Sequence, residues 1–205
     1  MNTSVQTLIE TRVSTKHYDV QQPLTDAQVH RLVDLATRAP SAFNFQNWKF
    51  IAVRSPEAKA RLHSVSYRQQ QVLDAPVTFI ICGQLAAHEN LSSTLAPTLD
   101  AGILDAETVA GWVAMAQQAH TNNPQLQRDE AVRSASLAAM TLMLAAQGMG
   151  LASGAMSGFD PAGVAAEFAL APHELPVMLV TVGHSTPGNW PQKPRKPVHE
   201  VMAFA

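Results

Sequence analysis

Hydrophobic positions along the chain follow two periods, which predict alternating helices and strands. From Val29 to Ala36 apolar residues recur at helical spacing, and Thr25 and Gln28 are placed as a capping box before them. The runs APVTFIICG and LPVMLVTVG are apolar throughout, which is typical of strands buried on both faces, and KFIAVRS predicts a third strand. We expect an α+β, three-layer α/β arrangement: a central mixed sheet flanked by helices.

One predicted helix stands out because it has almost no polar face. From Ala131 to Gln147 the only charged residue is Arg133, so we expect this helix in the core or at a subunit interface. The stretch MGLASGAMSGFDP then ends it with three glycines and predicts a turn. Asp160 and Pro161 have the N-cap and N1 preferences of a following helix.

Two regions are less regular. Residues 84–128 read as a variable lid or insert, in which Asp105 caps one clear helix. The tail from 189 onward is rich in proline and cannot form an ordinary helix or inner strand. Because no repeat or linker is visible, residues 1–205 are expected to form a single domain with this helical excursion.

Composition narrows the classes of function. Charged residues make up 15% and hydrophobic residues 46% of the chain, a balance that predicts apolar surface covered by a partner. The net charge of -2 gives no basic field for nucleic acid, and no window is apolar enough to span a membrane. The single cysteine, Cys82, fits a reducing compartment, so a cytoplasmic protein is expected.

Two basic motifs have the chemistry of a phosphate site. In an extended segment side chains two apart point the same way, so RVSTK places Arg12, Ser14 and Lys16 on one side. KPRKP does the same for Lys193 and Arg195 between stiffening prolines. The alternative for each is a solvated basic edge.

Two further motifs suit a flat, polar-edged ligand. The loop PSAFNFQNW offers Ser41, Asn44 and Gln46, whose groups can donate to and accept from a heterocycle edge, although they could instead tie down the loop backbone. The small residues of GAMSGFD let a backbone approach such a ligand closely, unless they form only a tight turn. The eight histidines lack metal-ligand spacing, and the chain has no Walker loop or GxGxxG motif.

Together and in this order, the four motifs resemble those of the FMN-dependent nitroreductase family. The resemblance runs from Ile9 to Val201 and is weakest between Gln84 and Arg128. RVSTK is similar to the family's R-x-S-x-K/R opening, and PSAFNFQNW is similar to its P-S-x-x-N-x-Q-x-W loop. GAMSGFD resembles the glycine turn beneath the flavin, and KPRKP resembles the K-x-R-x-P close.

The resemblance implies a nitroreductase-like fold and a role for individual residues. Arg12, Lys193 and Arg195 would hold the FMN phosphate with help from Ser14, and Lys16 would reach the pyrimidine end of the ring. The loop would contact the flavin from the other subunit of a homodimer, and the C-terminal tail would reach over that partner. The remaining implied contacts are Val13, Pro40, Ser41, Asn44 and Gln46, then Ala155, Met156, Ser157 and Gly158 along the ring, with Phe43 and Trp112 in the substrate pocket.

The implied reaction is flavin chemistry. NADH or NADPH would pass a hydride to flavin N5, and a nitroaromatic, quinone or related acceptor would then take it in ping-pong turnover. A reductase of one specific enone, aldehyde or halogenated aromatic, and a flavin-binding protein without turnover, are the alternatives. The sequence departs from the family pattern in two places: Arg68 and Gln71 fill the slots of residues at the pyrimidine edge, and Ser157 stands where an acid is common.

Overall fold

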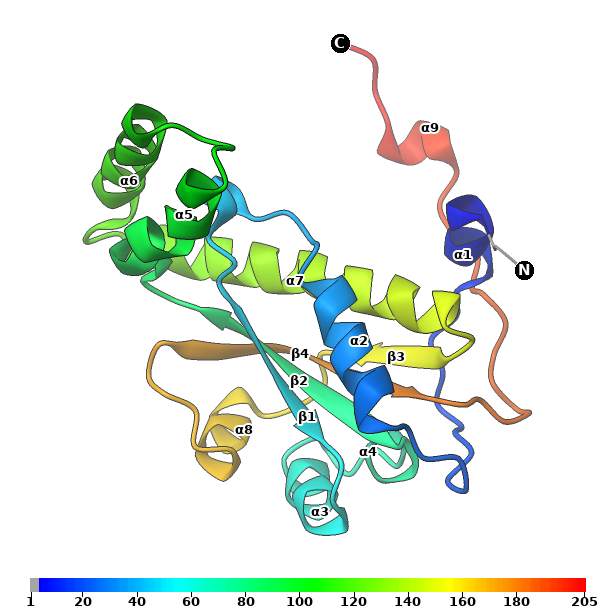
Figure 1. Cartoon of the computed structure of the whole chain (residues 1–205). Coiled ribbons are helices and arrows are strands. Elements are labelled where there is room, and N and C mark those ends of the chain that lie inside the picture. Colours follow the sequence, from blue (N-terminus) through cyan, green and yellow to red (C-terminus); the bar gives the residue numbers. More distant parts are fainter. Residues whose placement is uncertain (1–3) are drawn as a thin grey trace.

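The computed structural model describes residues 4–205 as helices around one sheet (Figure 1). The elements before the insert are α1 (Val5–Thr11), α2 (Asp26–Ala36), η1 (Ala42–Asn44), β1 (Trp48–Val53), α3 (Pro56–Ser64), α4 (Gln71–Asp74) and β2 (Val77–Gln84). The insert and the rest of the chain form η2 (Ala87–Asn90), α5 (Leu91–Asp100), α6 (Ala106–His120), α7 (Pro124–Gly148), β3 (Ala152–Met156), α8 (Pro161–Glu167), β4 (Glu174–Gly183) and α9 (Val198–Val201).

The sheet has the strand order β1-β2-β4-β3, and every pairing among the described residues is antiparallel. The expectation of a mixed sheet was therefore wrong for this chain. Unbroken apolar strands are most common in parallel sheets, because those are covered on both sides. Here β2 and β4 are equally apolar because helices cover both faces of an antiparallel sheet.

Two cores lie on the two faces of the sheet, which confirms the three-layer arrangement. On one face α2 and α7 pack over the sheet, with Phe79, Leu32 and Leu142 fully buried between them. On the other face α3 and α8 enclose Leu62 and Leu179. The apolar helix expected from Ala131 to Gln147 is the buried part of α7.

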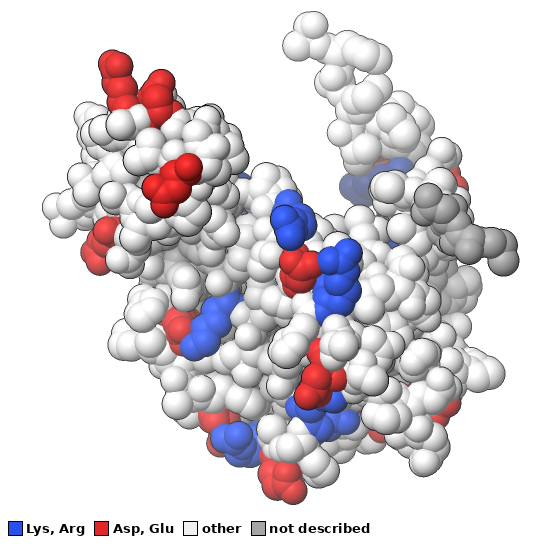
Figure 2. Space-filling model, viewed as in Figure 1, with Lys and Arg blue, Asp and Glu red and all other residues white. Residues whose placement is uncertain are grey.

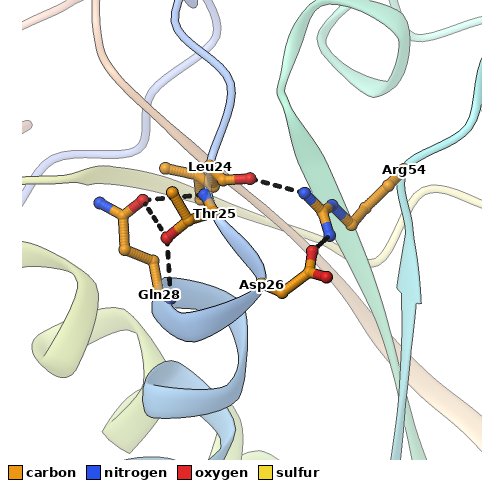
Figure 3. Close-up of polar contacts among 5 residues, drawn as sticks. All are labelled: Leu24, Thr25, Asp26, Gln28 and Arg54. Atoms are coloured by element: carbon orange, nitrogen blue, oxygen red, sulfur yellow. Dashed lines mark hydrogen bonds and ion pairs between the residues drawn. The ribbon is translucent and has the colours of Figure 1, made fainter.

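Local capping chemistry fixes the start of α2 (Figure 3). The Thr25 hydroxyl accepts from the backbone N–H of Gln28, and the Gln28 side chain accepts from the backbone N–H of Thr25, so the predicted capping box is confirmed. Arg54, just beyond β1, bonds both the Asp26 carboxylate and the Leu24 carbonyl. Its hydrogen bond to the carboxylate holds the pKa of Asp26 below its usual range.

The glycine-rich stretch after α7 is not only a turn. Residues 152–156 form β3, an edge strand paired with β4, and the turn is confined to the residues before Asp160. Gly154 is required because a Cβ there would lie 2.4 Å from the Thr15 carbonyl oxygen. The backbone N–H of Thr15 also donates to the Ser153 carbonyl at 3.0 Å, so the RVSTK segment lies directly against β3.

This close approach makes a testable prediction. Gly154→Ala should force Thr15 away from β3 and lower the free energy of unfolding by about 1–3 kcal/mol, the usual cost of overpacking. Gly111→Ala, in α6 with nothing within 4 Å of its added Cβ, should be neutral or raise stability by about 0.5–1 kcal/mol. Urea unfolding of both variants measures the difference, and equal stability of the two would contradict the argument.

Two segments project from the body, on the left and right of Figure 1. The insert contains α5 and α6, and Asp105 caps α6 as predicted. From Gln69 to Gln127 the chain has no Lys or Arg, and Figure 2 shows acidic residues on the outer part of this projection. The tail beyond β4 has one short helix, α9, which the proline pattern did not predict. Among residues 4–205 no helix is long and apolar enough to cross a membrane.

Candidate functional site

The two basic motifs meet in one cavity, although about 180 residues of sequence separate them. We call it the cation cavity; its lining is Arg12, Val13, Ser14, Lys16, Trp190, Pro191, Gln192, Lys193 and Arg195. The RVSTK segment lies between β3 and the tail. In the tail, the Gln192 amide donates to the Arg12 carbonyl at 3.2 Å. Thr15 is buried while Ser14 and Lys16 are exposed, which confirms the predicted alternation.

The cation cavity has an uncompensated positive charge. No Asp or Glu is among its lining residues, and within residues 4–205 none of its four cations forms an ion pair. Figure 2 shows basic atoms where the tail leaves the body. Four converging cations with a hydroxyl favour a multiply charged anion such as a phosphate monoester.

A second cavity adjoins the first and extends it along the sheet edge. Arg12, Ser14, Gln192 and Arg195 line both cavities. The rest of the second cavity is formed by Ile9 and Glu10 of α1, Met140 and Met143 of α7 and Ala155 of β3. Along this edge Ala155 and Ser157 are exposed, whereas the Met156 side chain is buried in the core beneath the sheet. A ring laid on this edge would therefore meet the Met156 backbone, not its thioether.

The segment around Arg68 lies beside the end of β3. The Gln69 amide donates to the Gly158 carbonyl at 2.6 Å, and the Gln71 amide donates to the Met156 sulfur at 3.0 Å. Gln71 therefore lies near the predicted ring position, but its donor is engaged within the protein. Arg68 is exposed and has a left-handed backbone with φ of 55°. Gln69 was not predicted from the sequence.

The loop between α2 and β1 has a strained backbone. Phe43, Asn44 and Gln46 all have positive φ, at 49°, 55° and 50°, which is unusual for a bulky residue such as Phe43. The Ser41 hydroxyl accepts from the Gln46 N–H at 2.9 Å, so Ser41 does tie down the loop. Pro40, Asn44 and Gln46 remain exposed. Strain of this kind persists where a loop must present particular groups.

Behind this loop lies an aromatic cluster. Phe43 contacts Phe45 at 5.4 Å and Trp112 at 6.3 Å between ring centroids, so the two predicted substrate-pocket residues do lie together. His120 packs edge-on against Phe45 and stacks on His88, and both histidines are buried. Because the backbone carbonyl of Ala116 accepts from Nδ1 of His120, that nitrogen carries the proton.

The aromatic part of the loop and the cation cavity lie toward opposite ends of α7. His120, which contacts the loop, accepts through its carbonyl from the Gln127 side chain near the start of α7. Thr11, beside the cation cavity, accepts from Gln147 at the other end. Twenty helical residues span about 30 Å, so Phe43 and Phe45 do not meet the cation cavity within one chain. Ala39, directly before the loop, packs against Ala138 in the middle of α7.

Other reactive groups lie outside these cavities. Burial raises the pKa of the Cys82 thiol to about 12, so this cysteine stays a neutral thiol near neutral pH. A buried thiol of this kind is chemically inert. Burial also raises the pKa of Tyr18, whose hydroxyl is bonded to Thr181. Among residues 4–205 no group of three or more His, Cys, Asp or Glu side chains could hold a metal ion.

The chain resembles known proteins over most of its length. YodC of Bacillus subtilis (strain 168), provisionally named an NAD(P)H nitroreductase, is 35% identical over 196 residues, which cover 94% of this chain and 91% of YodC. The solved structure of ydfN from Bacillus subtilis, provisionally named a nitroreductase, has a TM-score of 0.91 and 28% identity over 98% of each chain.

A further structure, from Exiguobacterium sibiricum 255-15, is a complex with FMN. It has a TM-score of 0.91 and covers 99% of this chain and 98% of its own, but at 24% identity the likeness shows the fold alone. The model of the nitroreductase family matches residues 9–184. With that match and the YodC relationship, this chain belongs to the nitroreductase family.

Proposed function

We propose that this protein is an FMN-dependent NAD(P)H oxidoreductase that reduces nitroaromatic, quinone or related acceptors. The observation that carries the proposal is the cation cavity, which opens along the exposed edge of β3. An anionic group would occupy the cation cavity, and a flat ring attached to it would lie along the edge of β3. The FMN complex of the Exiguobacterium sibiricum structure, and the NAD(P)H nitroreductase name of YodC, support this cofactor and this reductant.

The donor set favours FMN with its terminal phosphate. Arg12, Lys193 and Arg195 would bind the phosphate with Ser14, because they line one cavity and none of them forms an ion pair within residues 4–205. Gly154 brings the RVSTK segment against the sheet edge. Lys16 lines the cation cavity and not the second cavity, and it is the family motif that assigns Lys16 to the pyrimidine end of the ring. Ala155 and Ser157 leave that edge flat enough for a ring to lie on it.

When bound, FMN supplies the capacity to accept a hydride from NAD(P)H and to reduce a second substrate. The chain's own contribution is positioning and charge. Lys16 would place a cation near the pyrimidine end of the ring, where it favours added negative charge. Backbone groups of residues 155–158 would align with the ring, and the aromatic cluster of Phe43 and Trp112 would shield an acceptor from water.

The separation of the loop from the cation cavity supports a homodimer. A second copy could bring its Pro40, Ser41 and Asn44 to the flavin that the first copy holds, and the strained loop presents Pro40 and Asn44 to solvent. Apolar side chains of α1, α7 and the tail that are exposed in one chain supply surface for such a partner; they include Ile9, Leu137, Met140, Val201 and Phe204.

The dimer makes a prediction of its own. Light scattering at micromolar concentration should give about twice the chain mass of 22.1 kDa. Removing residues 198–205, which contain α9 and several exposed apolar side chains, should shift the protein toward monomer. A monomer that still binds flavin tightly would refute the contribution of a second subunit to the site.

The function itself is tested with purified protein supplied with FMN. Under nitrogen, the flavin absorbance should bleach on addition of NADH or NADPH and return when a nitroaromatic or quinone is added. Flavin released by denaturation should be FMN, since no dinucleotide-binding motif is present for the AMP half of FAD. Flavin that stays oxidised with both reductants would favour the alternative of a flavin-binding protein without turnover.

A further inference from the structure

Asn189 and Trp190 lie between the two basic motifs and belong to neither. The Asn189 side-chain oxygen accepts from the backbone N–H groups of Lys16 and His17, at 2.7 and 3.0 Å. Its amide nitrogen donates to the carbonyls of His17 and Thr186, at 3.0 and 2.9 Å. All four strong hydrogen-bonding positions of this amide are thus used, and three of them join Asn189 to the segment of Lys16 and His17, up to 173 residues away in the sequence.

Trp190 continues this junction with its ring. The Lys16 ammonium lies 4.7 Å from the indole centroid, and the Lys193 ammonium lies 5.0 Å from it. One indole therefore contacts a cation from each basic motif. Since no carboxylate among residues 4–205 lines the cation cavity, the π system of this indole is the group that attracts both lysines before any anion binds.

The ring is 59% exposed, so it contributes little to the core. Its place on the wall of the cation cavity gives it a different use. A lysine side chain has a flexible four-carbon stem, and its conformational entropy is lost when the ammonium binds an anion. A ring that already holds two such ammonium groups reduces that loss, which is the general basis of preorganised binding.

We propose that Asn189 and Trp190 form a clamp that positions Lys16 and Lys193 before the cofactor arrives. Asn189 fixes the backbone at Lys16, and Trp190 fixes both ammonium groups on one wall of the cation cavity. Trp190 is a positioning residue that acts through the lysines. The assignment rests on the proposed FMN site, because it is there that the two lysines would be used.

The first test needs no flavin. Lysines labelled with ¹³C-methyl groups are observed by NMR in flavin-free protein, where the indole ring current should move the Lys16 and Lys193 signals upfield. Trp190→Leu, which keeps an apolar side chain but removes the π face, should abolish both shifts. Trp190→Phe should retain part of them. Unshifted lysine signals in the wild-type protein would overturn the clamp.

The second test measures FMN affinity and midpoint potential. Trp190→Leu should weaken FMN binding by about threefold to tenfold, the scale of exposed cation–π contacts. It should also lower the midpoint potential of the bound flavin, as loss of the Lys16 charge should. Trp190→Phe should recover most of both. The matched control is Phe168→Leu, which removes the contact of Phe168 with Arg61 elsewhere on the surface and should leave FMN binding unchanged.

A double-mutant cycle shows whether the ring acts through the lysines. In a Lys16→Met/Lys193→Met background, Trp190→Leu should cost little further affinity, because the groups it positions are gone. An undiminished loss in that background would overturn the clamp and indicate a direct contact of Trp190 with the ligand. Absence of FMN uptake by the wild-type chain would instead overturn the proposed function, and the clamp's role with it, whatever the lysine signals show.

Discussion

Replacing Arg195 with alanine should weaken FMN binding by about tenfold to a hundredfold. Arg195 lines both the cation cavity and the second cavity, and its guanidinium is fixed by donation to the Lys193 carbonyl at 2.7 Å. A charge-assisted hydrogen bond to an anion contributes about 1.5–3 kcal/mol, which corresponds to that loss of affinity. Isothermal titration of the flavin-free variant with FMN measures it directly.

The neighbouring residue provides a matched control. Lys196 has the same charge in the same proline-rich segment but lines neither cavity. Lys196→Ala should therefore leave FMN affinity within a factor of about two, the scale of a screened surface charge. Turnover of Arg195→Ala should largely return when FMN is in excess, since the variant is defective in binding and not in the later steps. Equal losses in the two variants would assign the effect to general charge.

Lys16→Met should instead lower the midpoint potential of the bound flavin. Reduction adds negative charge to the ring, and a nearby cation favours the reduced form more than the oxidised form. Removing that cation should shift the potential downward by tens of millivolts, since about 30 mV corresponds to roughly 1.4 kcal/mol for a two-electron couple. Titration against a reference dye under nitrogen measures this shift.

Two comparisons distinguish this effect from a loss of binding. Lys16→Arg keeps the charge, so its bound flavin should have a midpoint potential close to that of the wild-type protein. Excess FMN should not restore the midpoint potential of Lys16→Met. Arg195→Ala, which removes a charge that we assign to the phosphate, should change the potential little. The reverse pattern, with Arg195→Ala shifting the potential and Lys16→Met leaving it unchanged, would show that the two roles are exchanged.

Features that depend on neighbouring residues were predictable from the sequence. The capping box at Thr25 and the N-caps at Asp105 and Asp160 are local hydrogen bonds, and the structure contains all three. The alternation of Arg12, Ser14 and Lys16 was equally predictable, because an extended chain fixes it. Four motifs in the expected order were sufficient to indicate the family.

Features that depend on distant partners were not predictable. Strand direction follows from which strands meet, so the antiparallel sheet and the edge strand β3 could not be inferred from apolar runs and glycines. His88 and His120 are stacked in space but have no telling spacing. Nor did any motif mark Asn189 and Trp190, which contact Lys16 near the other end of the chain.

The length of α7 has a genetic consequence if two copies pair as proposed. Each complete site would take its cation cavity from one chain and its loop from the other, because the two lie apart along α7 within one chain. A chain defective only in its cavity and a chain defective only in its loop would then complement each other when they are co-expressed. In a mixed dimer one site would inherit both defects and the other would inherit neither. Two inactive alleles would together restore activity that neither allele provides alone.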